Sequence, residues 1–152
     1  MIIHEPSVSY IRKNVPTKVM DDAEKSAEAF RNHAMENKHD PSLEYFTIAL
    51  LNRKNNVLAI KTIAMGGITS CVADIRIIFK ECFLHNATAL IVSHSHPSGD
   101  PTPSSADTNM TRKIREAAQL LEITFLDHIV MGEKENDPTG LGYYSYRAAG
   151  LI

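Results

Sequence analysis

The chain has 152 residues, of which 43% are hydrophobic and 22% are charged, a composition typical of one globular domain that buries its own core. Its formal net charge of −2 excludes the strong overall positive field that draws many proteins to nucleic acids or anionic membranes. The sequence shows no signal peptide and no apolar run long enough to span a bilayer, so we expect a cytoplasmic protein without membrane contact.

The first forty residues predict a single helix. It runs over about 21–37, with Asp21 as its N-cap and an apolar face that includes Ala27 and Phe30. The residues before it show no clear pattern, although 7–13 have the composition of a short edge strand.

Two β-type runs and a second helix follow. Residues 43–51 and 57–64 are joined by the polar turn NRKNN and predict a hairpin. A helix is expected over about 72–85, because its apolar residues recur at i, i+3 and i+4 and should face a core. These residues are Val72, Ile75, Ile78, Phe79, Cys82 and Phe83. Cys71 and Cys82 are too few and too poorly spaced for a disulfide framework or a C-x-x-C zinc site, so we expect buried thiols.

The rest of the chain alternates strands and helices. Residues 88–93 are apolar and β-rich and predict a strand buried on both faces. A helix is expected over about 104–121, a strand over 123–131, and a last short strand and turn over 143–150. The fold class that follows is α/β, one domain with a mixed central β-sheet flanked by helices.

The stretch HSHPSGDPTPSSAD, at 94–107, carries the residues most suited to chemistry. His94 and His96 stand at the end of the predicted strand, where side chains two residues apart point to the same face and can reach one metal ion. The Pro/Gly-rich loop after them ends at Ser104, and Asp107 falls in the first turn of the next helix. Two imidazoles and one carboxylate form a three-ligand set suited to catalytic zinc, whose fourth position is left to water.

Each part of this pattern also has a purely structural explanation. Two histidines at a strand end can simply be exposed or hydrogen-bonded. Ser104 can cap the helix, and the helix dipole favours an acid such as Asp107 in the first turn. These explanations do not exclude a metal, since an aspartate in the first turn can suit the dipole and also bind an ion. The complete spacing, rather than any one residue, favours the metal site.

This motif resembles the JAMM (JAB1/MPN+) metalloprotease motif in the form carried by RadC-like proteins. The likeness continues into the flanking segments GGITSCVADIRIIFKECFLHNATALIV, LLEITFLDHIVMG and YYSYRAAGLI. It implies a single JAB/MPN domain over 42–152, with a fold similar to that of the cytidine deaminases. Residues 1–41 would then be an N-terminal extension whose helix packs on that domain.

The resemblance further implies a zinc metalloprotease that hydrolyses a peptide or isopeptide bond in a peptide or protein substrate. His94, His96 and Asp107 would bind zinc, and Glu44, on an earlier strand, would be the catalytic general base. Two roles stay open for Ser104, helix cap or donor to the developing oxyanion. The residues alone support Glu44 less strongly, because an acid entering an apolar strand more often marks an exposed strand end.

Three further ionisable residues enter the interpretation. Glu81 is the rival base, but its place in the middle of a helix predicts a solvated face. Asp127 and His128 point to opposite sides of their strand, so at most one of them faces the site. A structural hydrogen-bonding role is favoured for His128, with orientation of a zinc ligand as the alternative. Neither residue is assigned as a ligand.

Other functions remain as alternatives. A nucleobase deaminase would need H-x-E and P-C-x-x-C motifs, which the sequence lacks. The DNA-repair label of RadC-like families suggests a nucleic-acid-binding module, but Arg112, Lys113 and Arg115 are expected on a solvated helix face. A catalytically silent interaction domain is disfavoured, because folding alone does not require the complete ligand set. The sequence favours no particular oligomeric state.

Overall fold

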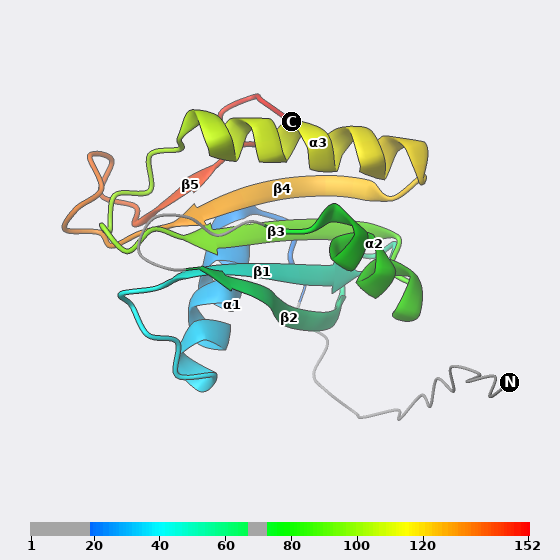
Figure 1. The fold of residues 1–152 in the computed structure, drawn as a ribbon, viewed down its shortest axis with the longest axis horizontal. Helices are drawn as coiled ribbons and strands as arrows, with labels where there is room; N and C mark the ends of the chain where they lie inside the picture. The colour runs from blue at the N-terminus through cyan, green and yellow to red at the C-terminus, as the bar shows by residue number, and fades with distance from the viewer. Residues whose placement is uncertain (1–18, 67–72) are drawn as a thin grey trace, which may run out of the picture.

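The computed structural model describes residues 19–66 and 73–152, and within them it contains a five-stranded sheet and three helices (Figure 1). The strands are β1 (Glu44–Leu51), β2 (Val57–Gly66), β3 (Ala89–Ser95), β4 (Thr124–Met131) and β5 (Tyr143–Ser145). The helices are α1 (Ala23–Glu36), α2 (Ile75–Leu84) and α3 (Ser105–Leu120). The predicted fold class, one α/β domain with a mixed sheet flanked by helices, is confirmed.

The strand order across the sheet is β2-β1-β3-β4-β5. β1 pairs antiparallel with both β2 and β3, so the predicted hairpin is confirmed. β3 and β4 are parallel, and α3 is the crossover between them. In such sheets ligands bind beyond the carboxyl ends of the strands. The loop that carries His96 and ends at α3 lies at this position.

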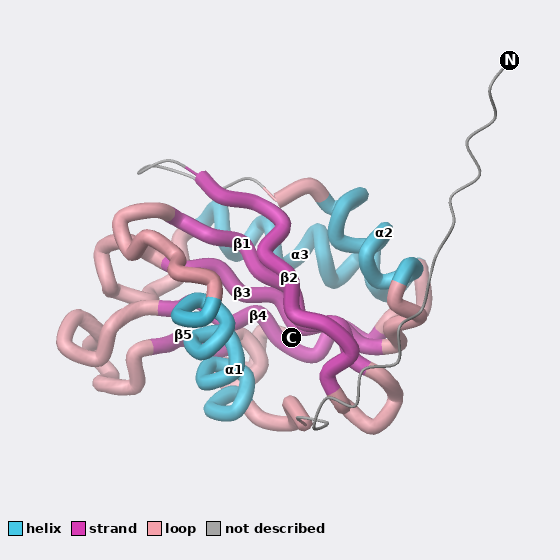
Figure 2. The backbone as a smooth tube through the Cα atoms, turned by 90° about the horizontal axis from the view of Figure 1, so that it is seen from below, coloured by secondary structure: helices cyan, strands magenta, loops and turns pink. Residues whose placement is uncertain are grey.

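The molecule has three layers, because helices cover both faces of the sheet. Figure 2 shows α2 and α3 on one side of the strands and α1 on the other. Successive residues of β1 alternate between the two faces, and Ile48, Ala49, Leu50 and Leu51 are all fully buried. Ile48 and Leu50 join the core under α2 and α3, whereas Ala49 and Leu51 join the core under α1.

The helix α1 begins one residue later than the sequence predicts. Asp22, not Asp21, is the N-cap, and its carboxylate accepts a hydrogen bond of 2.7 Å from the backbone N–H of Lys25. Asp21 instead forms an ion pair of 2.6 Å with the Nζ of Lys25. Both aspartates can serve a helix start, so sequence alone selected the wrong one of two adjacent acids.

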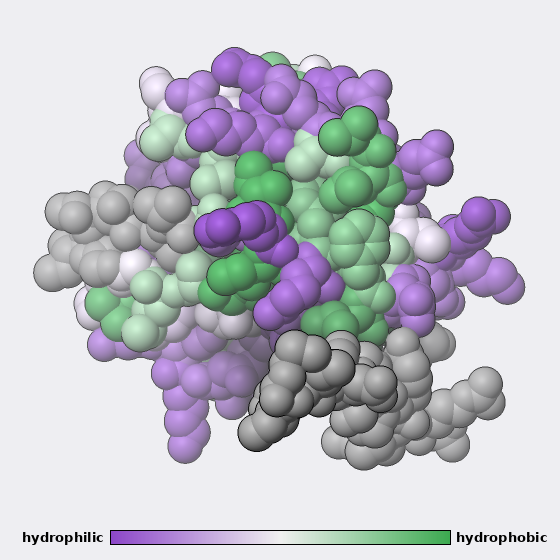
Figure 3. All heavy atoms as spheres, turned by 45° about the vertical axis from the view of Figure 1, so that its right-hand side comes forward, coloured by the Kyte–Doolittle hydropathy of each residue, from purple (hydrophilic) through white to green (hydrophobic). Residues whose placement is uncertain are grey.

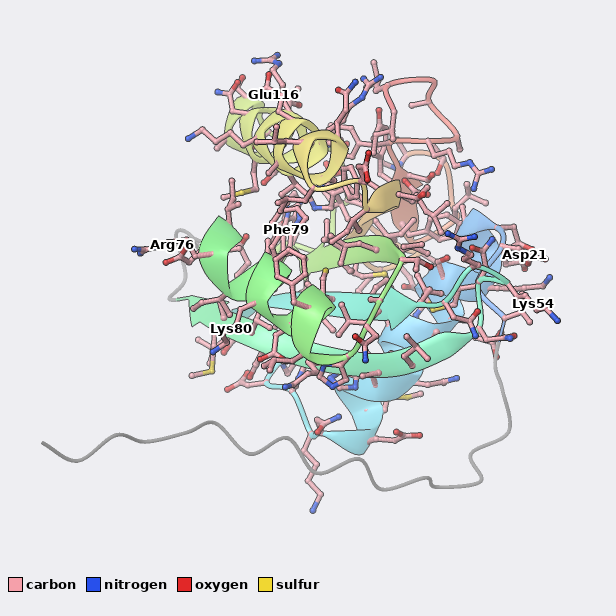
Figure 4. The ribbon with its side chains drawn as sticks, turned by 90° about the vertical axis from the view of Figure 1, so that its right-hand side faces the viewer. Asp21, Lys54, Arg76, Phe79, Lys80 and Glu116 are labelled. Atoms are coloured by element: carbon pink, nitrogen blue, oxygen red, sulfur yellow. The ribbon has the colours of Figure 1, made fainter. Side chains whose placement is uncertain are left out.

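The helix α2 starts at Ile75, with Asp74 as N-cap. Ile78, Phe79 and Cys82 are buried as predicted, and burial raises the pKa of the Cys82 thiol to about 12. Phe83 was predicted to face the core, but 57% of its surface is exposed, because it lies past the edge of the stripe that contacts the sheet. Figure 4 shows Phe79 on the inner side of α2.

The exposed apolar residues include Phe83 and Leu84 at the end of α2. Figure 3 shows hydrophobic side chains gathered near the middle of one face of the molecule.

Three sequence expectations fall outside the described residues: the edge strand at 7–13, the thiol of Cys71 and the helical residue Val72. No helix in the described part of the chain is long and apolar enough to cross a membrane.

Candidate metal centre

Three side chains from two elements converge at the carboxyl end of β3. The Nε2 atoms of His94 and His96 lie 2.9 Å apart. The carboxylate of Asp107 lies 3.1 Å from Nε2 of His94 through one oxygen and 3.4 Å from Nε2 of His96 through the other. All three potential ligand atoms lie within 4.8 Å of one another, and they are the one group in the described residues with the composition of a metal site.

The sequence positions these groups for identifiable reasons. His94 is in β3 and is almost fully buried, with the ring of Phe46 from the paired strand β1 stacked near it at 6.3 Å between centroids. His96 follows the strand, and its Nδ1 lies 2.8 Å from the backbone carbonyl of Asp100 in the loop. A carbonyl only accepts hydrogen bonds, so Nδ1 of His96 carries the proton and Nε2 keeps its electron pair for the cluster.

Asp107 occupies the third position of α3, where it completes a capping box with Ser104. The backbone N–H of Asp107 donates to Ser104 Oγ at 3.1 Å, and the backbone N–H of Ser104 donates to Asp107 Oδ2 at 2.6 Å. The Ser104 hydroxyl also donates to Asp107 Oδ2, at 2.7 Å. These bonds fix the carboxylate, whose other oxygen faces His94. The cap and the convergence on the histidines therefore coexist.

The electrostatics of the cluster favour a positive charge at its centre. Burial alone would raise the pKa of Asp107, but the neighbouring imidazoles of His94 and His96 outweigh it and hold that pKa well below its usual range. Burial likewise would lower the pKa of His96, yet the contacts with Asp107 and with the Asp100 carbonyl raise it overall. A carboxylate that stays ionised beside two imidazole electron pairs is a donor set that fits a divalent metal.

A second shell of contacts surrounds His94. Its Nδ1 lies 2.8 Å from Nε2 of His128, a fully buried residue of β4 whose pKa is lowered well below the ordinary value by burial and by the charge of His94. The ring of His128 stacks on Tyr146 at 5.2 Å between centroids. The expectation that at most one of Asp127 and His128 faces the site is confirmed.

Asp127 points to the opposite face and has a structural task. Its carboxylate accepts hydrogen bonds from the hydroxyl of Ser145 at 2.5 Å and from the backbone N–H of Arg147 at 3.0 Å. These contacts hold the segment after β5 against β4. Tyr146, between the two donors, is thereby placed on the ring of His128.

Comparison with known proteins places this geometry in a family. The family model of the RadC-like JAB domain matches residues 20–151. The chain belongs to the RadC-like JAB domain family. A UPF0758 protein of Syntrophomonas wolfei is 36% identical over 135 residues, 89% of this chain and 54% of the relative. A UPF0758 protein of Alkaliphilus metalliredigens is 40% identical over 128 residues, 84% of this chain and 52% of the relative. The chain thus spans about half the length of these relatives.

The two candidate bases of the RadC-like JAB domain have different surroundings. Glu44 is the half-buried first residue of β1, and its charge acts on His96. Its carboxylate has no hydrogen-bond partner among the described residues. Glu81 was predicted on a solvated face, but it is buried, 2.6 Å from Lys61 Nζ and 3.7 Å from His85 Nδ1. The correction has a tertiary cause, because β2 brings Lys61 over this face of α2.

Two residues of the site were missed by sequence reasoning. Thr111 is buried in α3, with its Oγ1 2.7 Å from the Asp107 carbonyl and 2.6 Å from Nδ1 of His128. Asp100 contributes its backbone carbonyl, to His96. The spacing of Thr111, four residues after Asp107, places both on one helix face and could have signalled its position. A backbone acceptor leaves no signal in the residue type.

The exposed face of α3 and a cavity near His96 are the other surface features close to the site, and neither identifies a partner. Arg112, Lys113 and Arg115 are exposed, as predicted for a solvated helix face. In Figure 4, Glu116 of the same helix points away from the sheet. On the α1 face of the sheet, a cavity of about 160 Å³ reaches His96. Its lining includes the apolar and aromatic residues Phe30, Leu43, Tyr45 and Met131.

Proposed function

We propose that this RadC-like JAB domain is a zinc-dependent metallopeptidase acting on a peptide or isopeptide bond. The convergence of two imidazoles and one carboxylate carries the proposal. In a tetrahedral zinc site with bonds of about 2.0–2.2 Å, neighbouring ligand atoms lie roughly 3.3 Å apart. The contacts among His94, His96 and Asp107 span 2.9–3.4 Å, and within the described residues three potential protein ligands meet there. Three protein ligands and an open position are typical of catalytic rather than structural zinc.

Zinc, when bound, would supply a water whose pKa is lowered from 15.7 to about 7 and would polarise the scissile carbonyl. Glu44 would take a proton from that water as the oxygen attacks the carbonyl carbon, and would then deliver it to the leaving nitrogen. The carbon–nitrogen bond breaks, and an acid and an amine are released. The absence of any hydrogen-bond partner for Glu44 among the described residues supports this role, since its carboxylate is available to water.

Ser104 is the proposed donor to the oxyanion that forms on the carbonyl oxygen. Its hydroxyl proton now points to Asp107 Oδ2, while its oxygen accepts from the Asp107 backbone N–H. Rotation about the Cβ–Oγ bond would redirect the proton, and the Ser104 oxygen would still accept from the backbone N–H of Asp107. Cap and oxyanion donor are therefore compatible roles for one side chain.

Metal analysis of protein purified without chelator tests the proposal directly. We expect close to one zinc per chain in the wild type and almost none after His94→Ala or Asp107→Ala. Circular dichroism of the variants serves as the control for folding. Wild-type protein that is folded but takes up no zinc, even when zinc is added, would refute the proposed function.

Glu44 and Glu81 provide a matched pair for the base assignment. Glu44→Gln should retain zinc and lose about 10²–10⁴-fold in hydrolysis of a fluorescence-quenched peptide library. Glu81→Gln should retain both zinc and hydrolysis, because its partners are Lys61 and His85. Full activity in Glu44→Gln, or equal loss in both variants, would rule out Glu44 as the base.

The two roles of Ser104 can be separated by substitution with glycine. Glycine at an N-cap costs only a few tenths of a kcal/mol of stability but has no hydroxyl to donate. Ser104→Gly should therefore lose about 10²–10³-fold in kcat with little change in the free energy of unfolding. Ser104→Thr should restore the rate. A glycine variant with wild-type kcat would leave Ser104 as a cap alone.

A further inference from the structure

His94 is the one proposed ligand whose second ring nitrogen meets another side chain rather than a backbone carbonyl. That side chain is His128, and beyond it the hydrogen bonds continue to Thr111 and to the backbone carbonyl of Asp107. The three contacts measure 2.8, 2.6 and 2.7 Å in that order. The chain of contacts therefore starts at one proposed ligand and ends at the backbone of another.

The donor and acceptor of each hydrogen bond in this series follow from its last group, the backbone carbonyl of Asp107. The Asp107 carbonyl only accepts, so the single hydroxyl proton of Thr111 is donated to it. Thr111 Oγ1 must then accept from His128, which places the His128 proton on Nδ1. The His128 ring is fully buried and its hydrogen-bond contacts are with His94 and Thr111 rather than with a carboxylate, so it is neutral and its Nε2 is an acceptor. Nδ1 of His94 must donate to it.

We propose that Thr111 and His128 are positioning residues that set the tautomer of His94. With its proton held on Nδ1, His94 presents the electron pair of Nε2 to His96 and Asp107, where a cation would sit. The inference rests on the proposed metal site, and it extends that site by two residues that bind no metal themselves. It also gives a role to the buried Thr–His pair that lies beside the apolar core under α2 and α3.

Packing around His128 also helps to hold its ring in place. His128 pairs with Val92 across the parallel strands β3 and β4, which places its ring on the same face as His94 and one pleat behind it. Tyr146 stacks on the His128 ring with 16° between the ring planes, and the ring centroid of Phe46 lies 6.0 Å from that of His128. These rings hold the plane of the His128 imidazole, and its hydrogen-bond contacts place Nε2 toward His94 and Nδ1 toward Thr111.

Ring-nitrogen NMR of the zinc-free wild-type protein tests the tautomers without any substitution. Long-range ¹H–¹⁵N spectra should show both His94 and His128 protonated on Nδ1 and unprotonated on Nε2. His94 protonated on Nε2 in the neutral ring would overturn the proposal. Failure of the wild type to bind zinc would refute the proposed function but leave this tautomer result standing, so the two failures are distinguishable.

Zinc affinity, measured by competition with a chelator, tests the consequence. Thr111→Val keeps the side-chain volume but removes the hydroxyl that accepts from Nδ1 of His128. It should weaken zinc binding about 10–100-fold. Thr111→Ser should restore it, and Thr47→Val, which removes a buried hydroxyl from the opposite face, should leave it unchanged. His128→Gln retains an acceptor near the Nε2 position and should bind zinc more tightly than His128→Phe. Equal zinc affinity in the wild type and Thr111→Val would refute the positioning role of Thr111 and His128.

Discussion

The described part of the chain has two histidine clusters, on opposite faces of the sheet, and only one of them has the composition of a metal site. On the α3 face, His94 and His96 meet Asp107. On the α1 face, His33 and His39 each place Nε2 3.1 Å from the hydroxyl of Thr62. The second cluster has no carboxylate at its centre. Its hydroxyl can donate one proton and accept others, so two neutral imidazoles satisfy it without a cation.

The two clusters differ in the charge that surrounds their paired imidazoles. Burial lowers the pKa of both His33 and His39, and for His33 the charge of His39 adds to the effect. Both rings are therefore held neutral around a neutral hydroxyl. In the first cluster, an ionised carboxylate lies among electron pairs whose directions are set from behind by His128 and Asp100. The excess of negative charge, rather than the number of histidines, distinguishes the site.

The largest expected effect comes from removing that charge. Asp107→Asn should weaken zinc binding by about 100-fold or more, because a neutral amide replaces the anionic ligand. His39→Gln should leave zinc affinity unchanged. Chelator competition on both variants provides the measurement. A comparable loss in His39→Gln would mean that the α1-face cluster also takes part in binding zinc.

Zinc should also stabilise the fold, since unfolding separates Asp107 on α3 from His94 and His96 at the end of β3. At a free zinc concentration of about 100 times Kd, the free energy of unfolding should rise by about 2.7 kcal/mol. Urea denaturation with and without zinc measures this increment. It should be the same in His39→Gln and fall to about 0.4 kcal/mol or less in Asp107→Asn. An equal increment in Asp107→Asn would place the bound metal elsewhere.

The comparison can be sharpened by giving the second cluster a carboxylate. Thr62→Asp places an acid between His33 and His39, and should create a second zinc site at least about tenfold weaker than the first. Thr62→Asn, with the same size and no charge, should bind no second ion. Isothermal titration with zinc counts the sites. One site in Thr62→Asp would show that charge alone does not convert the cluster.

The smallest expected effect is a pH dependence of stability from the α1-face cluster. The folded pKa values of His33 and His39 lie below the ordinary value of 6.5, so the unfolded chain binds more protons. The stability they contribute is present above about pH 6.5 and lost as pH falls through their folded pKa values. His39→Gln should therefore flatten the decline in unfolding free energy between about pH 7 and 5, by less than about 1 kcal/mol because the ring is partly solvated. A steeper decline of unfolding free energy in His39→Gln than in the wild type would contradict a lowered pKa for His39.

Much of the fold could be predicted because it depends on local pattern. Apolar, β-rich runs predicted β1 to β4, and the polar turn predicted the hairpin. Besides the burial of Glu81, errors occurred where two residues fitted one local role equally well or where a helix face extends past its partner. Asp21 against Asp22 at the start of α1 is the first kind, and Phe83 on α2 is the second.

The sequence by itself determined that His94, His96 and Asp107 could share one ion. Spacing along a strand and within the first turn of a helix follows from backbone geometry, which does not depend on distant contacts. Only the tertiary structure decided which groups surround them. The parallel pairing of β3 with β4 brings His128 behind His94, α3 brings Thr111 to His128, and β2 covers Glu81 with Lys61. These contacts join residues far apart in the chain, and no local propensity encodes them.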